Sequence, residues 1–69
     1  MHTKQIREAV NKISNKDVST VLNNVLRRHQ NCRDYRVYEN YKREISLLAK
    51  GNWQVYDRSV YLLAEIVKI

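Results

Sequence analysis

The stretch Val60-Tyr-Leu-Leu-Ala-Glu-Ile-Val-Lys-Ile69 is the most apolar run of the chain. Together with the residues before it, this run predicts a helix over about 53–68. A surface helix usually has one apolar face. This helix has two, so we expect it to be buried on both sides, by its own chain or by a second copy. One apolar stripe consists of Trp53, Tyr56, Val60, Leu63 and Val67, and the other of Val55, Leu62, Ile66 and Ile69.

The composition of the 69-residue chain indicates an all-α fold. It contains no proline and one glycine, which is too few for the turns of a β fold. A chain this short forms one domain with a small core, which a disulfide, a metal or oligomerisation usually reinforces. One cysteine cannot form an internal disulfide. We therefore expect a single helical domain over 1–69, a complete small protein that forms a homodimer or packs its helices with unusual regularity.

Hydrophobic periodicity upstream predicts three more helices, which makes the fold a small compact bundle of four. Thr3 is the expected N-cap of the first helix. Ser14 and Asp17 have the spacing of a capping box, which predicts Ser14 as the N-cap of the second helix. The approximate ranges of these three helices are 4–13, 15–30 and 32–50.

The third and fourth helices are separated by the only glycine of the chain. Asn31 is expected to cap the third helix, with Asp34 as the alternative. Gly51 follows the end of this helix, where glycine commonly adopts a left-handed conformation. Asn52 is then the expected N-cap of the last helix.

The third helix has the clearest separation of apolar and charged residues in the chain. Leu47 interrupts its charged side, and Glu39 and Glu44 flank that side, so the positive charge is not continuous. At about 100° per residue, the apolar side is formed by Val37, Tyr38, Tyr41, Ile45, Leu48 and Ala49. The opposite side, which we call the basic ridge, consists of Arg33, Arg36, Asn40, Arg43 and Lys50.

Lys and Arg outnumber Asp and Glu by 13 to 7, which gives a formal net charge of +6 and a pI of about 9.8. On so small a chain this balance favours an anionic partner, either nucleic acid or an acidic protein. We expect no membrane association, because Glu65 and Lys68 interrupt the longest apolar run and the last helix is too weakly basic for a lipid surface. The single cysteine and the absence of an apolar signal region after Met1 predict a cytoplasmic location.

The basic ridge predicts a small regulatory protein, such as a transcription regulator, that binds nucleic acid, DNA more readily than RNA, as a homodimer. Arginine pairs with phosphate or guanine, and the amide of Asn40 suits adenine. Arg27 and Arg28, at the end of the second helix, would extend the basic surface. The second helix, a short link and the third helix follow the order of a helix-turn-helix, although the link lacks the usual glycine. The alternative is that the ridge is only the solvated face of a bundle helix.

A second hypothesis is a protein-binding inhibitor or adaptor, of the kind that phages and mobile elements encode, which docks on a larger acidic partner. Aromatic side chains would anchor such a contact, because Tyr and Trp dominate the binding energy of many interfaces. The candidates for a partner or dimer interface are Tyr35, Trp53, Tyr56, Tyr61, Leu62, Ile66 and Ile69.

The chain shows no set of residues suited to catalysis or to a complete metal site. His29 and Cys32 stand three positions apart, which makes at most half of a four-ligand zinc site. A packed histidine and a partly buried thiol explain the two residues more simply. No carboxylates are paired for acid–base work, and no glycine-rich phosphate loop is present. We therefore expect no enzymatic activity, no cofactor, no metal and no small-molecule substrate.

Overall fold

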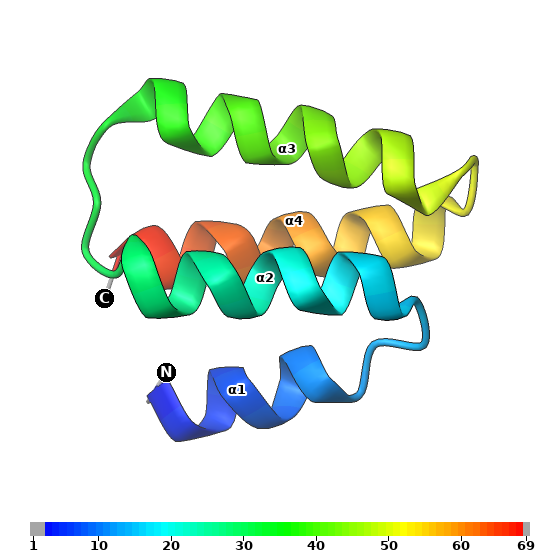
Figure 1. Cartoon of the computed structure of the whole chain (residues 1–69), viewed down its shortest axis with the longest axis horizontal. Helices are drawn as coiled ribbons and strands as arrows, with labels where there is room; N and C mark the ends of the chain where they lie inside the picture. The colour runs from blue at the N-terminus through cyan, green and yellow to red at the C-terminus, as the bar shows by residue number, and fades with distance from the viewer. Residues whose placement is uncertain (1–2, 69) are drawn as a thin grey trace.

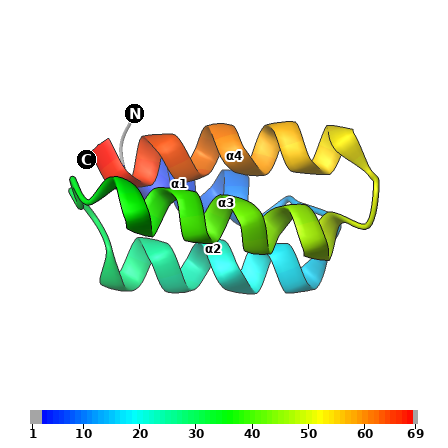
Figure 2. The same ribbon diagram turned by 90° about the horizontal axis from the view of Figure 1, so that it is seen from above.

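The computed structural model describes residues 3–68, and these residues form four helices and no strand. Figure 1 and Figure 2 together show that two of the helices form a central pair, with one further helix across each face of the pair. The central pair is α2 and α4, α3 covers one face and α1 the other. The predicted all-α bundle of four helices is confirmed. The bounds of the helices are α1 (Thr3–Asn11), α2 (Lys16–Arg28), α3 (Tyr35–Ala49) and α4 (Trp53–Lys68).

The bundle is built around the pair of α2 and α4, each of which contacts the other three helices. Leu62, Leu63 and Ile66 are 3%, 0% and 0% exposed, and they pack in one core with residues of α1, α2 and α3. The chain itself therefore buries the centre of both apolar stripes. Leu62 and Ile66, which the sequence assigns to a partner or dimer interface, are buried within the chain itself, so their side chains add almost no exposed surface to such an interface. Ile69, the third member of that group, lies outside the described residues.

The start of α4 departs from the predicted apolar stripe. Trp53 is the first residue of α4 and is 68% exposed, because it lies at the turn from α3, beyond the end of the core. Tyr56, one turn later, is half-buried and packs against the core. The predicted cap at Asn52 is confirmed, since its side-chain oxygen accepts a hydrogen bond from the backbone N–H of Val55 at 3.3 Å.

The first helix is shorter than expected. The structure includes Thr3 in α1, so this residue is helical rather than the cap that precedes the helix. α1 ends at Asn11, two residues before the predicted end, and Ile13 lies in the link to α2. Ile13 is nevertheless only 7% exposed. The apolar periodicity therefore predicted burial correctly but placed the end of the helix too late.

The N-cap of α2 is Asn15, and the prediction of Ser14 is wrong. The Asn15 side-chain oxygen accepts a hydrogen bond from the backbone N–H of Val18 at 3.1 Å. Its amide nitrogen donates to the backbone oxygen of Leu48 in α3 at 3.0 Å. The carboxamide of asparagine carries its acceptor oxygen and its donor nitrogen on separate atoms, which here reach two different helices. Asn15 therefore caps α2 and fastens it to the end of α3.

The third helix begins later than predicted. Asp34, the alternative to Asn31, is its N-cap and accepts from the backbone N–H of Arg36 at 2.9 Å. Asn31 has a left-handed backbone with φ of 53°, so the start near residue 32 is wrong. α2 also ends at Arg28, which leaves the link 29–34 outside both helices.

The order of α2 and α3 does not produce a helix-turn-helix. In both views α2 and α3 run side by side in opposite directions (Figure 1, Figure 2). The helices of a helix-turn-helix instead cross at about 90–120°. The likeness to a helix-turn-helix is therefore limited to the order of the elements, and α2 and α3 form an antiparallel hairpin of helices.

The end of α3 carries two consecutive left-handed residues. Gly51 has φ of 85°, which confirms its predicted conformation. Lys50 has φ of 53° and is the C-cap of the helix. The left-handed region costs a residue with a side chain about 1–2 kcal/mol, a cost that glycine does not bear. Lys50 therefore occupies a position where glycine would be the more stable choice.

Ser59 lies on the buried side of α4, and we expect its substitution by alanine to stabilise the protein. It is 0% exposed, and its hydroxyl oxygen has no hydrogen-bond partner among the described residues. A buried hydroxyl without a partner costs about 1–3 kcal/mol, and alanine also favours a helix more than serine. We expect Ser59→Ala to raise the free energy of unfolding by about 1 kcal/mol, measured by urea denaturation. Ser46→Ala on the exposed side of α3 is the control, and an equal gain there would contradict the explanation.

Candidate nucleic-acid interface

The basic ridge lies on the outward side of α3. Arg36, Asn40 and Arg43 are exposed on the helix itself. Arg33 and Lys50 are exposed just outside its two ends. α3 packs only against α2 and α4, so no other described helix covers its outer side (Figure 1). The 15 residues of α3 span about 22 Å at 1.5 Å per residue, and the ridge follows this whole length.

The cations of the ridge are almost free of internal ion pairs. Among residues 3–68, the only ion pair joins Arg36 Nε to Asp34 Oδ1 at 3.4 Å. The Arg36 side chain is 89% exposed, and a surface pair of this kind contributes little to stability. Glu39, which flanks the ridge, interacts with Tyr35: a hydrogen bond between these side chains raises the pKa of Tyr35. The positive charges of the ridge are therefore available to an external anion.

Arg27 does not extend the ridge. It lines a surface groove of about 410 Å³ with Arg7 of α1, on the face of the central pair opposite to α3. Its Nη2 atom donates to Asn24 Oδ1 at 2.6 Å. Arg28 is exposed at the last position of α2, beside His29, whose ring contacts Tyr41 of α3. Of the two supporting arginines, Arg27 lies on the α1 side of the bundle, and Arg28 precedes a residue that contacts α3.

The exposed aromatic side chains do not form one patch. Tyr35 is 70% exposed at the start of α3, and Trp53 is 68% exposed at the start of α4, at opposite ends of the bundle (Figure 1). Tyr61 is 58% exposed about two turns beyond Trp53, and Tyr56 is half-buried. The one large aliphatic side chain that is exposed within residues 3–68 is Leu47, at 73%, inside the ridge. A single aromatic hot spot is therefore not assembled by this fold.

Among residues 3–68, the fold brings no third possible metal ligand to His29 and Cys32. The backbone N–H of His29 donates to Val25 at the end of α2, and its ring centroid lies 5.5 Å from that of Tyr41. Cys32 is a free, partly exposed thiol in the link, and its backbone N–H donates to the oxygen of His29 at 3.2 Å. Within the described part of the chain, no three His, Cys, Asp or Glu residues are grouped to hold a metal.

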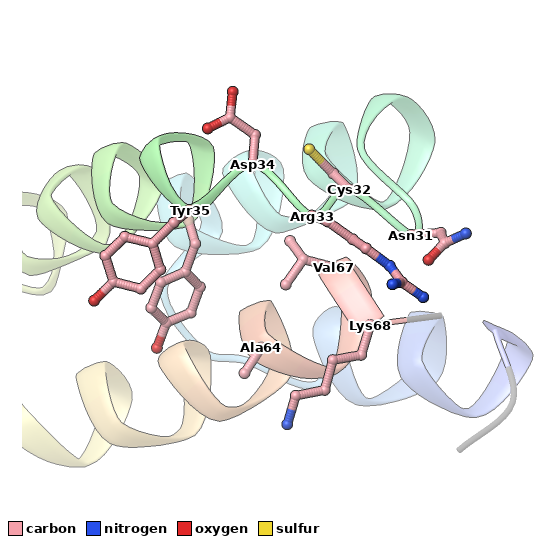
Figure 3. A pocket seen from close by; sticks show the side chains of 9 residues that line it. Asn31, Cys32, Arg33, Asp34, Tyr35, Ala64, Val67 and Lys68 are labelled. Carbon is pink, nitrogen blue, oxygen red and sulfur yellow. The ribbon is translucent and has the colours of Figure 1, made fainter.

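A second surface feature, which no sequence pattern predicts, lies at the start of α3. The link and the first turn of α3 face the last turns of α4 across a groove of about 490 Å³ (Figure 3). We call it the link groove. Only the packing of α3 against α4 brings these distant segments together, so local periodicity could not reveal it. Its lining includes Cys32, Arg33, Tyr35, Tyr38, Val67 and Lys68.

The cap of α3 predicts a pH dependence of stability. Hydrogen bonds from the backbone N–H and the guanidinium of Arg36 lower the pKa of Asp34 below its ordinary value of 3.8. A carboxyl with a lowered pKa in the folded state stabilises the fold above its ordinary pKa and loses this effect as the pH falls through the lowered value. We expect Asp34→Ala to be less stable than the unmodified protein at pH 7, and the difference to shrink below about pH 4.

Thermal unfolding over a pH series measures this difference. Asp34→Asn is the control, because asparagine caps a helix as well as aspartate and has no charge to titrate. A difference between Asp34→Ala and the unmodified protein that stays constant down to pH 2 would contradict the role of the ionised carboxyl.

The comparisons with known proteins give no relative from which a function could be inferred. A proposal about function therefore rests on the fold and on the charge pattern. No protein-family model matches the chain, and neither the curated proteins nor the solved structures yield a match. Within residues 3–68, no helix combines the length and the apolar character needed to cross a bilayer. The class that the fold defines is a small, basic, all-α bundle of four helices.

Proposed function

We propose that this chain is a small cytoplasmic regulatory protein, not an enzyme, that binds nucleic acid through the basic ridge, and DNA in preference to RNA. The observation that carries the proposal is that the ridge cations lie on the uncovered side of α3 with one weak ion pair among them. Cations that neutralise phosphates release counterions, which supplies most of the affinity of a basic protein for DNA. The net charge of +6 acts in the same direction.

The outer side of α3 suits a groove of duplex DNA. The major groove is about 12 Å wide and admits a single helix. In that position Arg36 and Arg43 would contact phosphates or guanines, and Asn40 between them would contact a base edge. A homodimer belongs to this proposal, and its contact has to use exposed residues such as Trp53 or Tyr61, because Leu62 and Ile66 are buried.

Fluorescence anisotropy of a labelled DNA duplex over a salt series tests the proposed function. Four ridge cations (Arg33, Arg36, Arg43 and Lys50) predict a slope of about −3 to −4 in a plot of log affinity against log salt concentration, since each neutralised phosphate contributes about −0.9. A duplex RNA of the same sequence is expected to bind more weakly. Absence of binding to any duplex at low salt would overturn the proposal.

The substitution of Lys50 by glycine is expected to raise the stability of the protein and to weaken its binding to DNA. Lys50→Gly removes the cost of the left-handed backbone, so we expect the free energy of unfolding to rise by about 0.5–1 kcal/mol. It also removes one ridge cation, so the salt slope of duplex binding should become shallower by about 0.9. Urea denaturation and anisotropy measure the two effects. Lys50→Asn, which removes the same charge, is the control for binding, and a loss of stability in Lys50→Gly would contradict the first part.

The second candidate function is a protein-binding inhibitor or adaptor, and exposed Leu47 favours it. Leucine at 73% exposure in the middle of a polar ridge is a natural anchor for a partner's apolar pocket. Leu47→Lys separates the two functions. It adds a cation to the ridge, so duplex affinity should rise with a steeper salt slope, whereas a protein contact anchored by Leu47 should be lost.

A further inference from the structure

The link groove combines an exposed aromatic ring, an apolar floor and two cations. Tyr35 is 70% exposed, and its ring centroid lies 6.0 Å from that of the half-buried Tyr38. Val67 forms part of the floor, and Figure 3 shows Tyr35 and Arg33 on opposite sides of it. Lys68 projects beside Val67 from the last turn of α4. The groove therefore has an aromatic side, and its two cations project in different directions from its rim (Figure 3).

The acidic residue at the groove does not cancel its positive charge. The Asp34 carboxylate points away from Val67 in Figure 3 and accepts hydrogen bonds from Arg36. Arg33 and Lys68 have no ion pair with another described residue. The volume of about 490 Å³ lies within the range of about 300–1,000 Å³ typical of sites for small ligands. A ligand with a flat ring and an anionic group would match the aromatic side and the cations of the groove.

We propose that the link groove binds one unpaired nucleotide of a nucleic acid, with the base stacked on Tyr35 and the backbone phosphates on either side of it attracted to Arg33 and Lys68. This inference rests on the proposed function and deepens it. Stacking on a tyrosine accepts any base, because every base has a flat π face. Arginine and lysine are the usual phosphate partners, and arginine can bind two phosphate oxygens at once.

The position of the groove relative to the ridge supports this occupant. Arg33 belongs to both surfaces, and Tyr35 lies about 100° around α3 from its neighbour Arg36. A duplex on the ridge that ends in a single-stranded overhang could therefore pass its first unpaired nucleotide into the groove. An acidic peptide would match the cations, but its carboxylates would leave the exposed ring of Tyr35 without a stacking partner.

The test compares a labelled blunt DNA duplex with the same duplex carrying a three-nucleotide overhang. The unmodified protein should bind the overhang probe about tenfold more tightly, the gain that one stacked base typically brings. Tyr35→Ala should remove this preference and keep the affinity for the blunt duplex. Tyr35→Phe is the matched control, because it retains the ring and should retain the preference. Tyr35 is mostly exposed, so neither change is expected to unfold the protein.

Cys32, the only cysteine of the chain, provides an independent readout within the groove. An oligothymidine strand should slow the alkylation of its thiol by iodoacetamide, measured by mass spectrometry, and Tyr35→Ala should abolish this protection. Protection by an acidic peptide but not by oligothymidine would overturn the nucleotide assignment in favour of a protein partner.

The failures of the two proposals are distinguishable. Duplex binding that shows no preference for the overhang overturns the groove proposal and leaves the proposed function in place. Protection of Cys32 by oligothymidine without any duplex binding would overturn the proposal that the ridge binds duplex DNA. It would support the proposal that the link groove binds a nucleotide. Loss of the preference in both Tyr35→Ala and Tyr35→Phe would overturn stacking as its cause.

Discussion

The double substitution Arg36→Glu with Arg43→Glu is expected to abolish measurable binding to a DNA duplex. Each change removes one phosphate contact and introduces a repulsive charge at the same place, and the formal net charge falls by four from +6. We expect affinity to fall by about a hundredfold or more, with a salt slope shallower by about two units. Anisotropy with the labelled duplex measures both quantities.

A matched control separates the ridge from the net charge. Lys4→Glu with Lys12→Glu lowers the net charge by the same amount at exposed positions before α2, away from the ridge. Its effect on affinity should be several-fold smaller than that of the ridge substitutions. Circular dichroism should show an unchanged helix content in both proteins, because all four side chains are exposed. Equal losses in the two double variants would show that the charge of the whole molecule, and not the ridge, determines binding.

The substitution Leu63→Ala is expected to bring the fold close to complete unfolding. Leu63 is 0% exposed in the core cluster, on one of the two helices that contact all the others. Loss of a fully buried leucine side chain costs about 3–4 kcal/mol. A domain of 69 residues has a total stability of about 3–10 kcal/mol at the usual 0.05–0.15 kcal/mol per residue. The loss is therefore a large part of the whole.

Urea denaturation followed by circular dichroism measures this loss. Leu47→Ala is the matched control, since it deletes the same atoms from a position that is 73% exposed. That change should alter stability by less than about 0.5 kcal/mol. A protein with Leu63→Ala that is as stable as the control would contradict the central place of α4 in the core.

The helices and most of the core could be predicted because both depend on local periodicity. An apolar residue that recurs every three or four positions is buried wherever the neighbouring helix lies. Val18, Leu22 and Val25 of α2 and Ile45 of α3 are all 0% exposed, as their spacing predicts. The two apolar stripes of α4 likewise predicted a helix with neighbours on several sides, although they did not show which of these neighbours the same chain supplies.

The caps and the candidate site could be predicted only in part, because they depend on contacts between distant segments. Ser14 has the better local motif, but Asn15 also bonds to Leu48, which is 33 positions away. Arg27 and Arg28 are neighbours in the chain, yet Arg27 lies beside α1, away from the ridge. The link groove exists only because the end of α4 passes the start of α3.

The central position of α4 also has a consequence for biosynthesis, because this helix is the last of the four to be translated. α1 and α3 do not contact each other, so the helices made earlier cannot close a core without it. At about 5–20 residues per second, the 16 residues of α4 take about one to three seconds to synthesise. During that time the residues of α1, α2 and α3 that pack against α4 lack this partner. Completion of the core therefore follows translation of α4, and a chain truncated before Trp53 would lack Leu62, Leu63 and Ile66 of that core.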